Sequence, residues 1–234
     1  MKREERNRVS NIGQRLGWKK KSIFSELSYW GSLQVRHSID VMHQEKNVGE
    51  NLLYTILGIT WKSKDGLKAR QDLKVMGIRT MLYPQLLASG KTLLYTARFT
   101  MDKTHQDIFL RVLKSIQVPD GYAANLSRCV HFKERNIWGL KSHDMHIIMQ
   151  QFLPVAIRKA LQVDVVKVFI ELSNFYRQLC SKSNRVIDLK SLQECIILTL
   201  CHLEKIFPPA FFDIMEHLTI HLAEEASIAG PAQF

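Results

Sequence analysis

The sequence lacks the features that identify several common enzyme and membrane classes. No run of about 18 consecutive apolar residues occurs, which excludes a membrane-spanning helix. The patterns G-x-x-x-x-G-K-[ST], G-x-G-x-x-G and G-x-S-x-G are absent, so a nucleotide-binding loop, a serine hydrolase and a small-molecule cofactor have no support. No segment repeats with a period of roughly 20 to 50 residues, which excludes a solenoid.

Cysteine is also scarce, with four residues in 234 and no C-x-x-C pair. This spacing argues against a zinc ribbon and against a thioredoxin-type motif. The N-terminal segment has no apolar stretch after its charges, so we do not expect a secretory signal, and we expect the thiols to be reduced. Three of the four cysteines lie in apolar helical surroundings, where we expect them to be small buried hydrophobic residues.

Positive charge is abundant, with 33 Lys and Arg against 22 Asp and Glu, a net charge of +11. Residues 1–21 hold eight of these cations and two glutamates, whereas the segment after Lys205 is acidic. A basic balance favours a polyanionic partner such as DNA. We predict a flexible basic leader over residues 1–17 and nuclear localisation, with a plain solvated tail and the cytoplasm as the alternatives.

The apolar periodicity predicts a mainly α fold with at most a short β-hairpin, in two packed subdomains, 18–117 and 118–234. The boundary follows from Pro119-Asp120-Gly121, a strong turn signal. Residues 19–39 mix aromatic and β-branched residues, as in a short strand or an extended docking segment. Residues 81–99 are expected to be a loop and 129–140 a hairpin around the polar KERN. Helices are expected over Val41–Leu57, 63–78 (opened by the Asp65-Gly66 turn), 100–116 (with Thr100 as N-cap), Asp144–Leu161, Val163–Leu179, Leu189–Ile206 and Pro209–Ala226.

The stretch HSIDVMHQEKN concentrates histidines, acids and an amide. If Val35–Asn51 is helical, 100° per residue places one set of polar side chains within about a third of the circumference and turns Glu45 away from them. This face is either a functional site or a partly buried polar network. A single carboxylate cannot run two-metal chemistry, which needs several acids around two cations. The set comprises His37, Asp40, His43, Gln44, Asn47 and Asn51.

Three other groups are weaker candidates for binding sites. His143 and His146 lie one turn apart after Ser142, the expected N-cap, and His217 and His221 have i,i+4 spacing. The first pair is a candidate metal or phosphate site, with a structural role as the alternative. The second pair is a candidate metal site, with an amphipathic packing helix as the alternative, because the H-E-x-x-H order is absent. A basic cluster is a candidate for phosphate contact. Its members are Lys62, Lys64, Lys68, Arg70, Lys74 and Arg79.

Several strings together resemble one family, the plant CACTA (En/Spm-like) transposases. They occur in the family's order and cover nearly everything from Trp18 onward. They are WKKKSIFSELSYW, LQVRHSIDVMHQEKNVGENLL, SKDGLKARQDLKVMGIR, VPDGYAANLSRCV, GLKSHDMHIIMQQFLPVAIR and LEKIFPPAFFDIMEHLTIHLAEEASIAGPAQF.

The resemblance implies that the first part is the end of an RNase H-like catalytic region. It implies that the second part is the DUF4218-type domain of unknown function that follows. The family's RHxLDVMHxEKN motif matches Arg36, His37, Asp40, His43, Glu45 and Asn47, among others. In that family the implied chemistry is Mg²⁺-dependent DNA cleavage and strand transfer. Asp40 is our candidate for the last acid of the triad and for a Mg²⁺ ligand, with Glu45 as the runner-up.

Departures from the family pattern shape the functional expectation. The family's upstream sheet, first two catalytic acids and C-P-x-C element have no counterpart, and Met145 stands where KSHDCH has a cysteine. The sequence also stops at GPAQF, within a motif that continues in the family. We therefore expect a truncated transposon-derived chain with no nuclease activity of its own and no bound Mg²⁺. It would contact DNA through the leader and the basic cluster, and transposase chains or itself as further partners. The alternative is a helical protein–protein interaction module without DNA-processing activity.

Overall fold

A computed structural model of the chain describes residues 22–118 and 126–230. The chain divides into a short unit that ends at Ser38 and a larger unit that begins at Ile39. In the described part of the short unit, 22–38, two 3-10 turns, Ile23–Glu26 and Trp30–Ser32, stand where a strand or extended segment was expected. The Phe24 ring stacks on Trp30 with a centroid distance of 5.0 Å.

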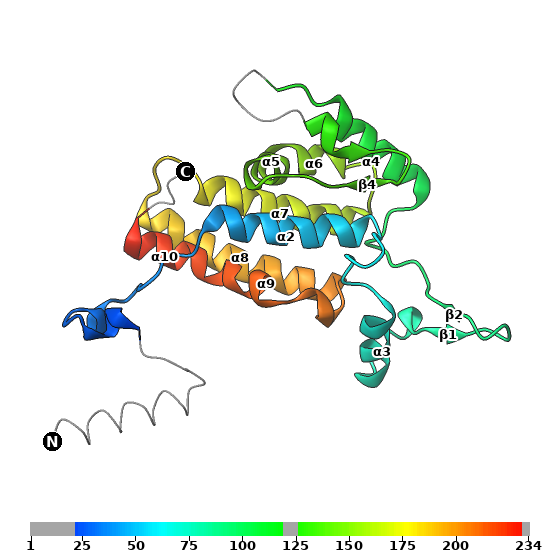
Figure 1. Cartoon of the computed structure of the whole chain (residues 1–234), viewed down its shortest axis with the longest axis horizontal. Coiled ribbons are helices and arrows are strands. Elements are labelled where there is room, and N and C mark those ends of the chain that lie inside the picture. The colour runs from blue at the N-terminus through cyan, green and yellow to red at the C-terminus, as the bar shows by residue number, and fades with distance from the viewer. Residues whose placement is uncertain (1–21, 119–125, 231–234) are drawn as a thin grey trace. The chain divides into compact units, whose positions relative to one another are not determined.

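The larger unit is mainly helical, which confirms the predicted fold class. Figure 1 shows the helices packed along one another, with α5 continuing into α6 through a π-helical segment, Ile148–Phe152. Shorter 3-10 turns occupy Thr80–Leu82, Leu126–Cys129, Pro209–Phe211 and Thr219–His221. The α-helices are α2 (Val41–Ile56), α3 (Leu67–Val75), α4 (Lys103–Ser115), α5 (Ser142–Ile147), α6 (Leu153–Ala156), α7 (Val163–Leu179), α8 (Val186–Ile206), α9 (Ile214–Leu218) and α10 (Leu222–Ala229).

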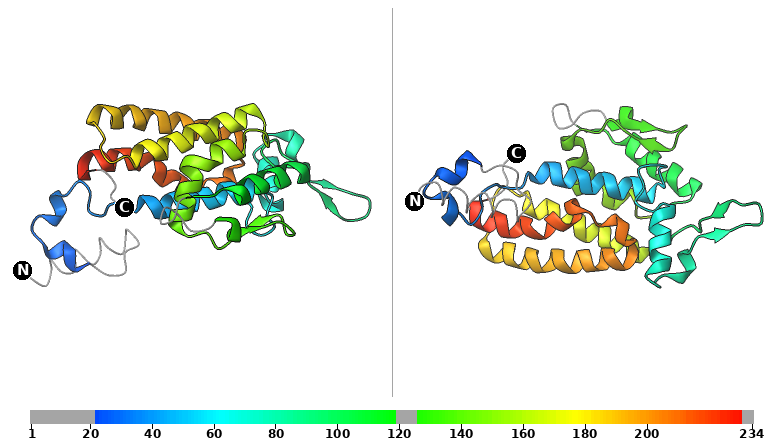
Figure 2. Two further views of the ribbon diagram at one scale, coloured as in Figure 1. Left: turned by 90° about the horizontal axis from the view of Figure 1, so that it is seen from above. Right: turned by 60° about the horizontal axis from the view of Figure 1, so that its bottom comes forward.

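The described residues contain two short antiparallel strand pairs, one more hairpin than predicted. The pair β3 (Val130–His131) and β4 (Asn136–Ile137) is the hairpin expected around KERN. The pair β1 (Gln85–Leu86) and β2 (Thr92–Leu93) lies in the segment expected to be a loop. The β1–β2 hairpin extends away from the helices in both views of Figure 2, and its strand residues are exposed.

Helix α2 follows its sequence signals closely. Asp40 is its N-cap, and the predicted apolar stripe is buried along its length, with Leu52 and Ile56 both at 0% exposure. The helix ends before Gly58, which has φ 61° and so adopts a left-handed conformation that favours glycine.

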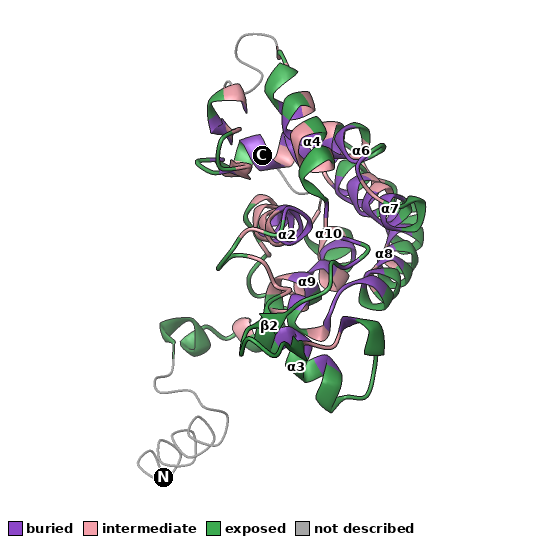
Figure 3. Ribbon diagram, turned by 90° about the vertical axis from the view of Figure 1, so that its right-hand side faces the viewer, coloured by how far each residue is buried: buried purple, intermediate pink, exposed green. Residues whose placement is uncertain are grey.

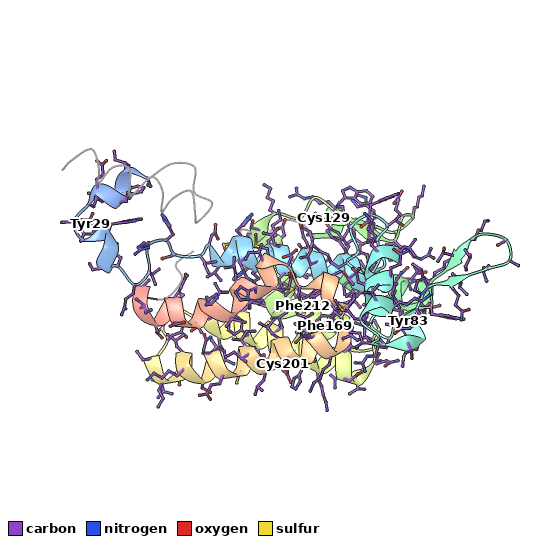
Figure 4. All side chains as sticks on the ribbon, turned by 90° about the horizontal axis from the view of Figure 1, so that it is seen from below. Tyr29, Tyr83, Cys129, Phe169, Cys201 and Phe212 are labelled. Atoms are coloured by element: carbon purple, nitrogen blue, oxygen red, sulfur yellow. The ribbon has the colours of Figure 1, made fainter. Side chains whose placement is uncertain are left out.

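Helix α2 is enclosed by helices from the second half of the sequence. It packs against α5 and α9, while α7 lies along α8 and α8 along α10. Figure 3 shows the buried faces of α7 and α8 turned toward the other helices, with solvent-exposed residues on their outer faces. Aromatic rings fill part of this core, including Phe169, which is labelled in Figure 4 and is 1% exposed. One hydrophobic core therefore joins residues from both predicted subdomains.

The expected helix Asp144–Leu161 is interrupted by the π-helical segment. Pro154 explains this, because proline has no N–H and its ring clashes with the carbonyl four residues earlier. A wider turn before Pro154 relieves the clash. One carbonyl in this segment, that of Met149, accepts a hydrogen bond from the Ser173 hydroxyl at 2.6 Å.

Several helix ends differ from the predictions. Asp102, not Thr100, caps α4, because its carboxylate accepts the His105 N–H at 2.8 Å. Ser142 is the first residue of α5 rather than its N-cap, and Asp144 binds the Lys141 N–H at 3.0 Å. Helix α8 begins at Val186, three residues before the predicted start.

The remaining predictions concern the boundary, membrane segments and cysteines. The predicted boundary at Pro119-Asp120-Gly121 and the predicted leader 1–17 lie outside the described residues, so both stay predictions. None of the described helices has the length and apolar character to cross a membrane. All four thiols are free. Cys195 and Cys201 are exposed on α8, contrary to the expectation of buried helical cysteines, and Cys201 is labelled in Figure 4.

Candidate functional site

Asp40, the candidate catalytic acid, lies at the start of α2 with an exposed side chain. Its Oδ1 accepts a hydrogen bond from the backbone N–H of His43 at 2.9 Å. This is the usual contact of an N-cap aspartate, whose negative charge is favourable at a helix N-terminus. The geometry gives Asp40 a structural function that requires no metal.

The predicted polar face of HSIDVMHQEKN is not continuous, because α2 begins at Val41 and not at Val35. His37 belongs to the short unit, where its ring meets Trp30 edge to face at 5.5 Å and Arg36 donates to the Trp30 carbonyl at 3.1 Å. On α2, His43 is exposed and Asn47 donates to the His43 carbonyl at 2.8 Å. The motif residues therefore divide between the two units.

Glu45, the runner-up acid, is the centre of a buried polar cluster. Its side chain is 0% exposed, and its Oε2 lies 2.7 Å from Nδ1 of His146 on α5. The Gln150 amide, in the π-helical segment, donates to Glu45 Oε1 at 3.2 Å. Cys180, at the C-terminal end of α7, completes the group, and the ligand atoms of Glu45, His146 and Cys180 all lie within 4.8 Å of one another. We call these three residues the Glu-His-Cys cluster.

The surroundings of this cluster disfavour negative charge. Burial raises the pKa of Glu45, and the hydrogen bond and charge of His146 only partly oppose this effect. Burial and the neighbouring Glu45 carboxylate raise the pKa of Cys180 to about 12. Because the thiolate is the reactive form of cysteine, Cys180 does not resemble a catalytic nucleophile.

A second buried network joins α2 to α7 and α9. The Tyr176 hydroxyl donates to Gln44 Oε1 at 2.8 Å. The Gln44 amide donates to the Met215 carbonyl at 2.8 Å and to the Thr219 hydroxyl at 2.6 Å. Gln44 is 1% exposed, so these bonds satisfy its buried amide. This part of the predicted face is a buried structural network, the alternative left open by the sequence.

A third contact continues this network along α2. Asn51 donates to Glu216 Oε1 at 2.9 Å, and Lys64 pairs with Asp213 at 2.8 Å. Burial, together with the neighbouring Asp213, raises the pKa of Glu216 to about 7. The pKa of Asp213 is lowered to about 2, because hydrogen bonds from its neighbours and the Lys64 charge outweigh its partial burial.

The predicted basic cluster of residues 62–79 is largely engaged in intramolecular contacts. Arg70 is 2% exposed and paired with Asp65, so it does not face solvent. Arg79 donates to three carbonyls at the end of α8, among them that of Phe207 at 2.5 Å. The Nζ of Lys62 lies 4.3 Å from the centre of the Tyr54 ring. Lys68 and Lys74 are exposed.

A basic groove lies beside Arg79 in the larger unit. Its volume is about 910 Å³. Burial, and to a smaller extent the nearby Arg98, lower the pKa of Arg79. Arg98 pairs with Asp164 at 2.7 Å, and Lys159 and Lys205 are exposed. The ionisable side chains on the groove wall are Arg79, Arg98, Lys159, Lys205, His105 and Asp102.

The two predicted histidine pairs have different surroundings. The rings of His143 and His146 have centroids 6.1 Å apart, and His146 belongs to the Glu-His-Cys cluster. Nε2 of His217 and Nε2 of His221 are 3.4 Å apart on α9 and the turn that follows it. Across residues 22–118 and 126–230, no third ligand joins that second pair.

A two-metal Mg²⁺ site does not fit the described residues. Such a site requires several carboxylates around a pair of cations. Among those residues, the Glu-His-Cys cluster is the group of three or more metal-ligating side chains, and it contains one carboxylate and not Asp40. Its imidazole and thiol are donors that Mg²⁺ disfavours.

Sequence reasoning missed the two assemblies that the fold creates. Lys159 and Lys205 are far apart in sequence, so no local sequence pattern predicts the groove. Glu45 was disfavoured because it points away from Asp40 on an isolated helix, yet that direction is the one in which α5 lies. His146 was the one member of the Glu-His-Cys cluster that spacing had selected.

Comparison with known proteins gives one partial match. No curated protein and no solved structure matches the chain. Residues 179–234, which include α8, α9 and α10, match the family described as a domain of unknown function (DUF4218). The C-terminal quarter of the chain is therefore similar to a domain found in plant transposase-like proteins.

Proposed function

We propose that this chain is a transposase-related helical protein that binds DNA through phosphate contacts along the basic groove and has no strand-cleaving activity of its own. Its origin in a CACTA-type element and its action in the nucleus belong to the same proposal. The DUF4218 match supports the relation to transposases. The groove supports the contact with DNA.

The observation that carries the proposal is the charge of the groove. Four cationic side chains from separate segments line it, against one acid on the wall, Asp102; one of the four, Arg98, is paired with Asp164 beside the groove. Lys159 and Lys205 are exposed and make no ion pair within the described part of the chain. Lysine and arginine that converge in this way suit the phosphates of a nucleic acid, since they neutralise charge without reading sequence.

The absence of cleavage activity follows from the position of the acids. Asp40 uses one carboxylate oxygen to cap α2, and Glu45 is buried against His146. Neither belongs to a set of carboxylates within the described ranges that would hold two divalent ions. A role in holding DNA, rather than cutting it, agrees with this geometry.

DNA binding is tested by fluorescence anisotropy with duplex DNA at several salt concentrations. The double variant Lys159→Gln/Lys205→Gln should bind more weakly, and the slope of log K against log salt should fall by about 2 in magnitude, because each phosphate contact contributes about 0.9. Lys190→Gln is the matched control, since Lys190 is exposed on α8 about 22 Å from Lys205 along the helix. An equal loss per lysine replaced in the two variants would show that binding is non-local and would contradict the groove.

Cleavage is tested on the same DNA with Mg²⁺ present. We expect no cut product from the wild-type chain or from Asp40→Ala. Mg²⁺-dependent cutting by the wild type that disappears in Asp40→Ala would overturn the proposed lack of activity.

A second candidate function, protein–protein interaction, is favoured by exposed apolar side chains. They gather on α3, the β1–β2 hairpin and their flanks, where Trp61 is 99% exposed and Val75 88%. Large exposed apolar side chains in one region often mark binding surfaces. Size-exclusion chromatography with light scattering separates the two functions. A DNA-indifferent oligomer favours the interaction module, and a monomer with salt-sensitive DNA binding favours the groove.

A further inference from the structure

The Glu-His-Cys cluster brings three different metal-ligating groups together from distant parts of the sequence. Glu45 lies on α2, His146 on α5 and Cys180 at the end of α7. Glu45 and His146 are separated by 101 residues, yet their ligand atoms are 2.7 Å apart. All three ligand atoms fit within 4.8 Å.

We propose that Glu45, His146 and Cys180 bind a divalent ion of the zinc class, with a water molecule as the fourth ligand. The ion would link three helices of the core. This inference does not depend on DNA binding by the groove.

The ligand set selects the class of ion. Zinc binds imidazole nitrogen, thiolate sulfur and carboxylate oxygen in proteins, usually with four ligands in a tetrahedron. Magnesium and calcium prefer oxygen ligands, so a site with one nitrogen and one sulfur is poor for either.

Charge balance also favours a divalent cation. The Glu45 side chain is 0% exposed, and Cys180 lies next to it in a half-buried position. A carboxylate, a thiolate and a neutral imidazole carry two negative charges, which one Zn²⁺ neutralises. Buried charges are tolerated when they are paired or coordinate a metal.

The geometry requires side-chain movements on the order of 1 Å, because the three ligand atoms lie within 4.8 Å of one another and a tetrahedral ion holds sulfur about 3.5 Å from an oxygen or nitrogen ligand. Metal–ligand bonds of about 2.0–2.1 Å at a tetrahedral angle separate oxygen and nitrogen ligands by about 3.3 Å. The present separation of 2.7 Å must widen by roughly 0.6 Å, which rotations of the two side chains can supply. The His146 side chain is 18% exposed, so an ion can reach the cluster from solvent.

The Gln150 amide stabilises the cluster from the next turn of the chain. Its Nε2 lies 3.2 Å from Glu45 Oε1, 3.4 Å from Glu45 Oε2 and 3.1 Å from His146 Nδ1, so an ion bound by Oε2 and Nδ1 would leave the amide to donate to Oε1 alone. A hydrogen bond to the second oxygen of a ligating carboxylate fixes its orientation. Gln150 is thus a positioning residue for the proposed site.

The test uses the full chain, purified under reducing conditions and stripped with a chelator. It is titrated with Co²⁺, which reports thiolate coordination by a sulfur-to-metal charge-transfer absorption, and then with Zn²⁺, which should displace Co²⁺. We expect one ion per chain, the charge-transfer band, and a rise in melting temperature with Zn²⁺, since a ligand that binds only the folded state stabilises it.

Two cysteine variants locate the site. Cys180→Ser should lose the charge-transfer band and the rise in melting temperature, whereas Cys201→Ser, the matched control at an exposed position on α8, should keep both. Glu45→Gln should weaken Zn²⁺ binding at least tenfold, with the band retained at saturating Co²⁺. Should Cys180→Ser not fold, X-ray absorption of the Zn²⁺-loaded wild type gives the same information, with one sulfur ligand expected.

Three outcomes would overturn the proposal. One is a wild-type chain that binds no more Co²⁺ than Cys180→Ser. Another is a zinc environment without sulfur. The third is binding that survives Cys180→Ser but is lost in His217→Asn/His221→Asn, which would assign the ion to the histidine pair near the C-terminus.

Discussion

Replacing Tyr176 with phenylalanine removes one oxygen from the centre of the helical core. Tyr176 is 0% exposed, and its hydroxyl donates to Gln44 Oε1 at 2.8 Å. Phenylalanine keeps the ring and therefore leaves almost no cavity. The substitution removes a hydrogen-bond donor from the buried side-chain carbonyl oxygen of Gln44.

The magnitude follows from the cost of an unsatisfied buried acceptor, about 1–3 kcal/mol. We expect Tyr176→Phe to lower the free energy of unfolding by about 2 kcal/mol. For a chain of this size this corresponds to a melting temperature lower by about 4–8 °C. Urea unfolding followed by circular dichroism measures the first quantity, and calorimetry measures the second.

Tyr95→Phe is the matched control. The Tyr95 hydroxyl also bonds to a glutamine, Gln85 at 2.8 Å, but the residue is 42% exposed, so water replaces the lost bond. We expect a change below about 0.5 kcal/mol for this variant.

A double-mutant cycle with Gln44→Ala decides whether the reasoning is correct. In that background the Tyr176 hydroxyl has already lost Gln44 as its acceptor and no Gln44 oxygen is left unsatisfied, so Tyr176→Phe should cost clearly less than in the wild type. An equal cost of Tyr176→Phe in both backgrounds would refute the argument that the Gln44 acceptor carries the effect.

Two further predictions concern packing and pH. Gly49→Ala should lower the free energy of unfolding in urea by about 1 kcal/mol. A Cβ at this position would lie 2.6 Å from the buried Met145 Sδ, and this overpacking outweighs the gain in helix propensity. Gly31→Ala, which has open space around it, should change the free energy of unfolding little. Glu216 has a pKa raised to about 7 from 4.5, so its stabilisation is complete below pH 4.5 and is lost as the pH rises through 7. The free energy of unfolding should fall by up to about 2.5 kcal/mol between pH 5 and pH 8, and an equally steep fall in Glu216→Gln would count against this origin.

The sequence predicted the helices whose signals are local. Helix α7 has the predicted bounds, because its apolar periodicity is regular. Helix α2 ends one residue before its predicted end, because Gly58 follows it as a stop signal. The π-helical segment before Pro154 was not predicted. A proline within an apolar pattern indicates a disturbance but does not specify whether the helix bends, stops or widens.

The candidate site was less accessible to sequence reasoning for a topological reason. On an isolated helix, Glu45 does not share a face with Asp40, and its own partners cannot be identified from the spacing of residues within α2. Glu45 has its partners 101 and 105 residues away, at His146 and Gln150. Such contacts depend on how helices pack, and no spacing within one helix reveals them.

The boundaries of the DUF4218 match differ from those of the folded unit, because helix α2 lies outside the match and packs against it. The segment that matches DUF4218 begins at residue 179, yet its α9 is bound to α2 through Gln44 and Asn51. A protein cut to the boundaries of the match would lose those partners, and the Met215 carbonyl and Glu216 would lose the amides that satisfy them. A recombinant protein that starts before Ile39 contains both the matched segment and helix α2, against which that segment packs.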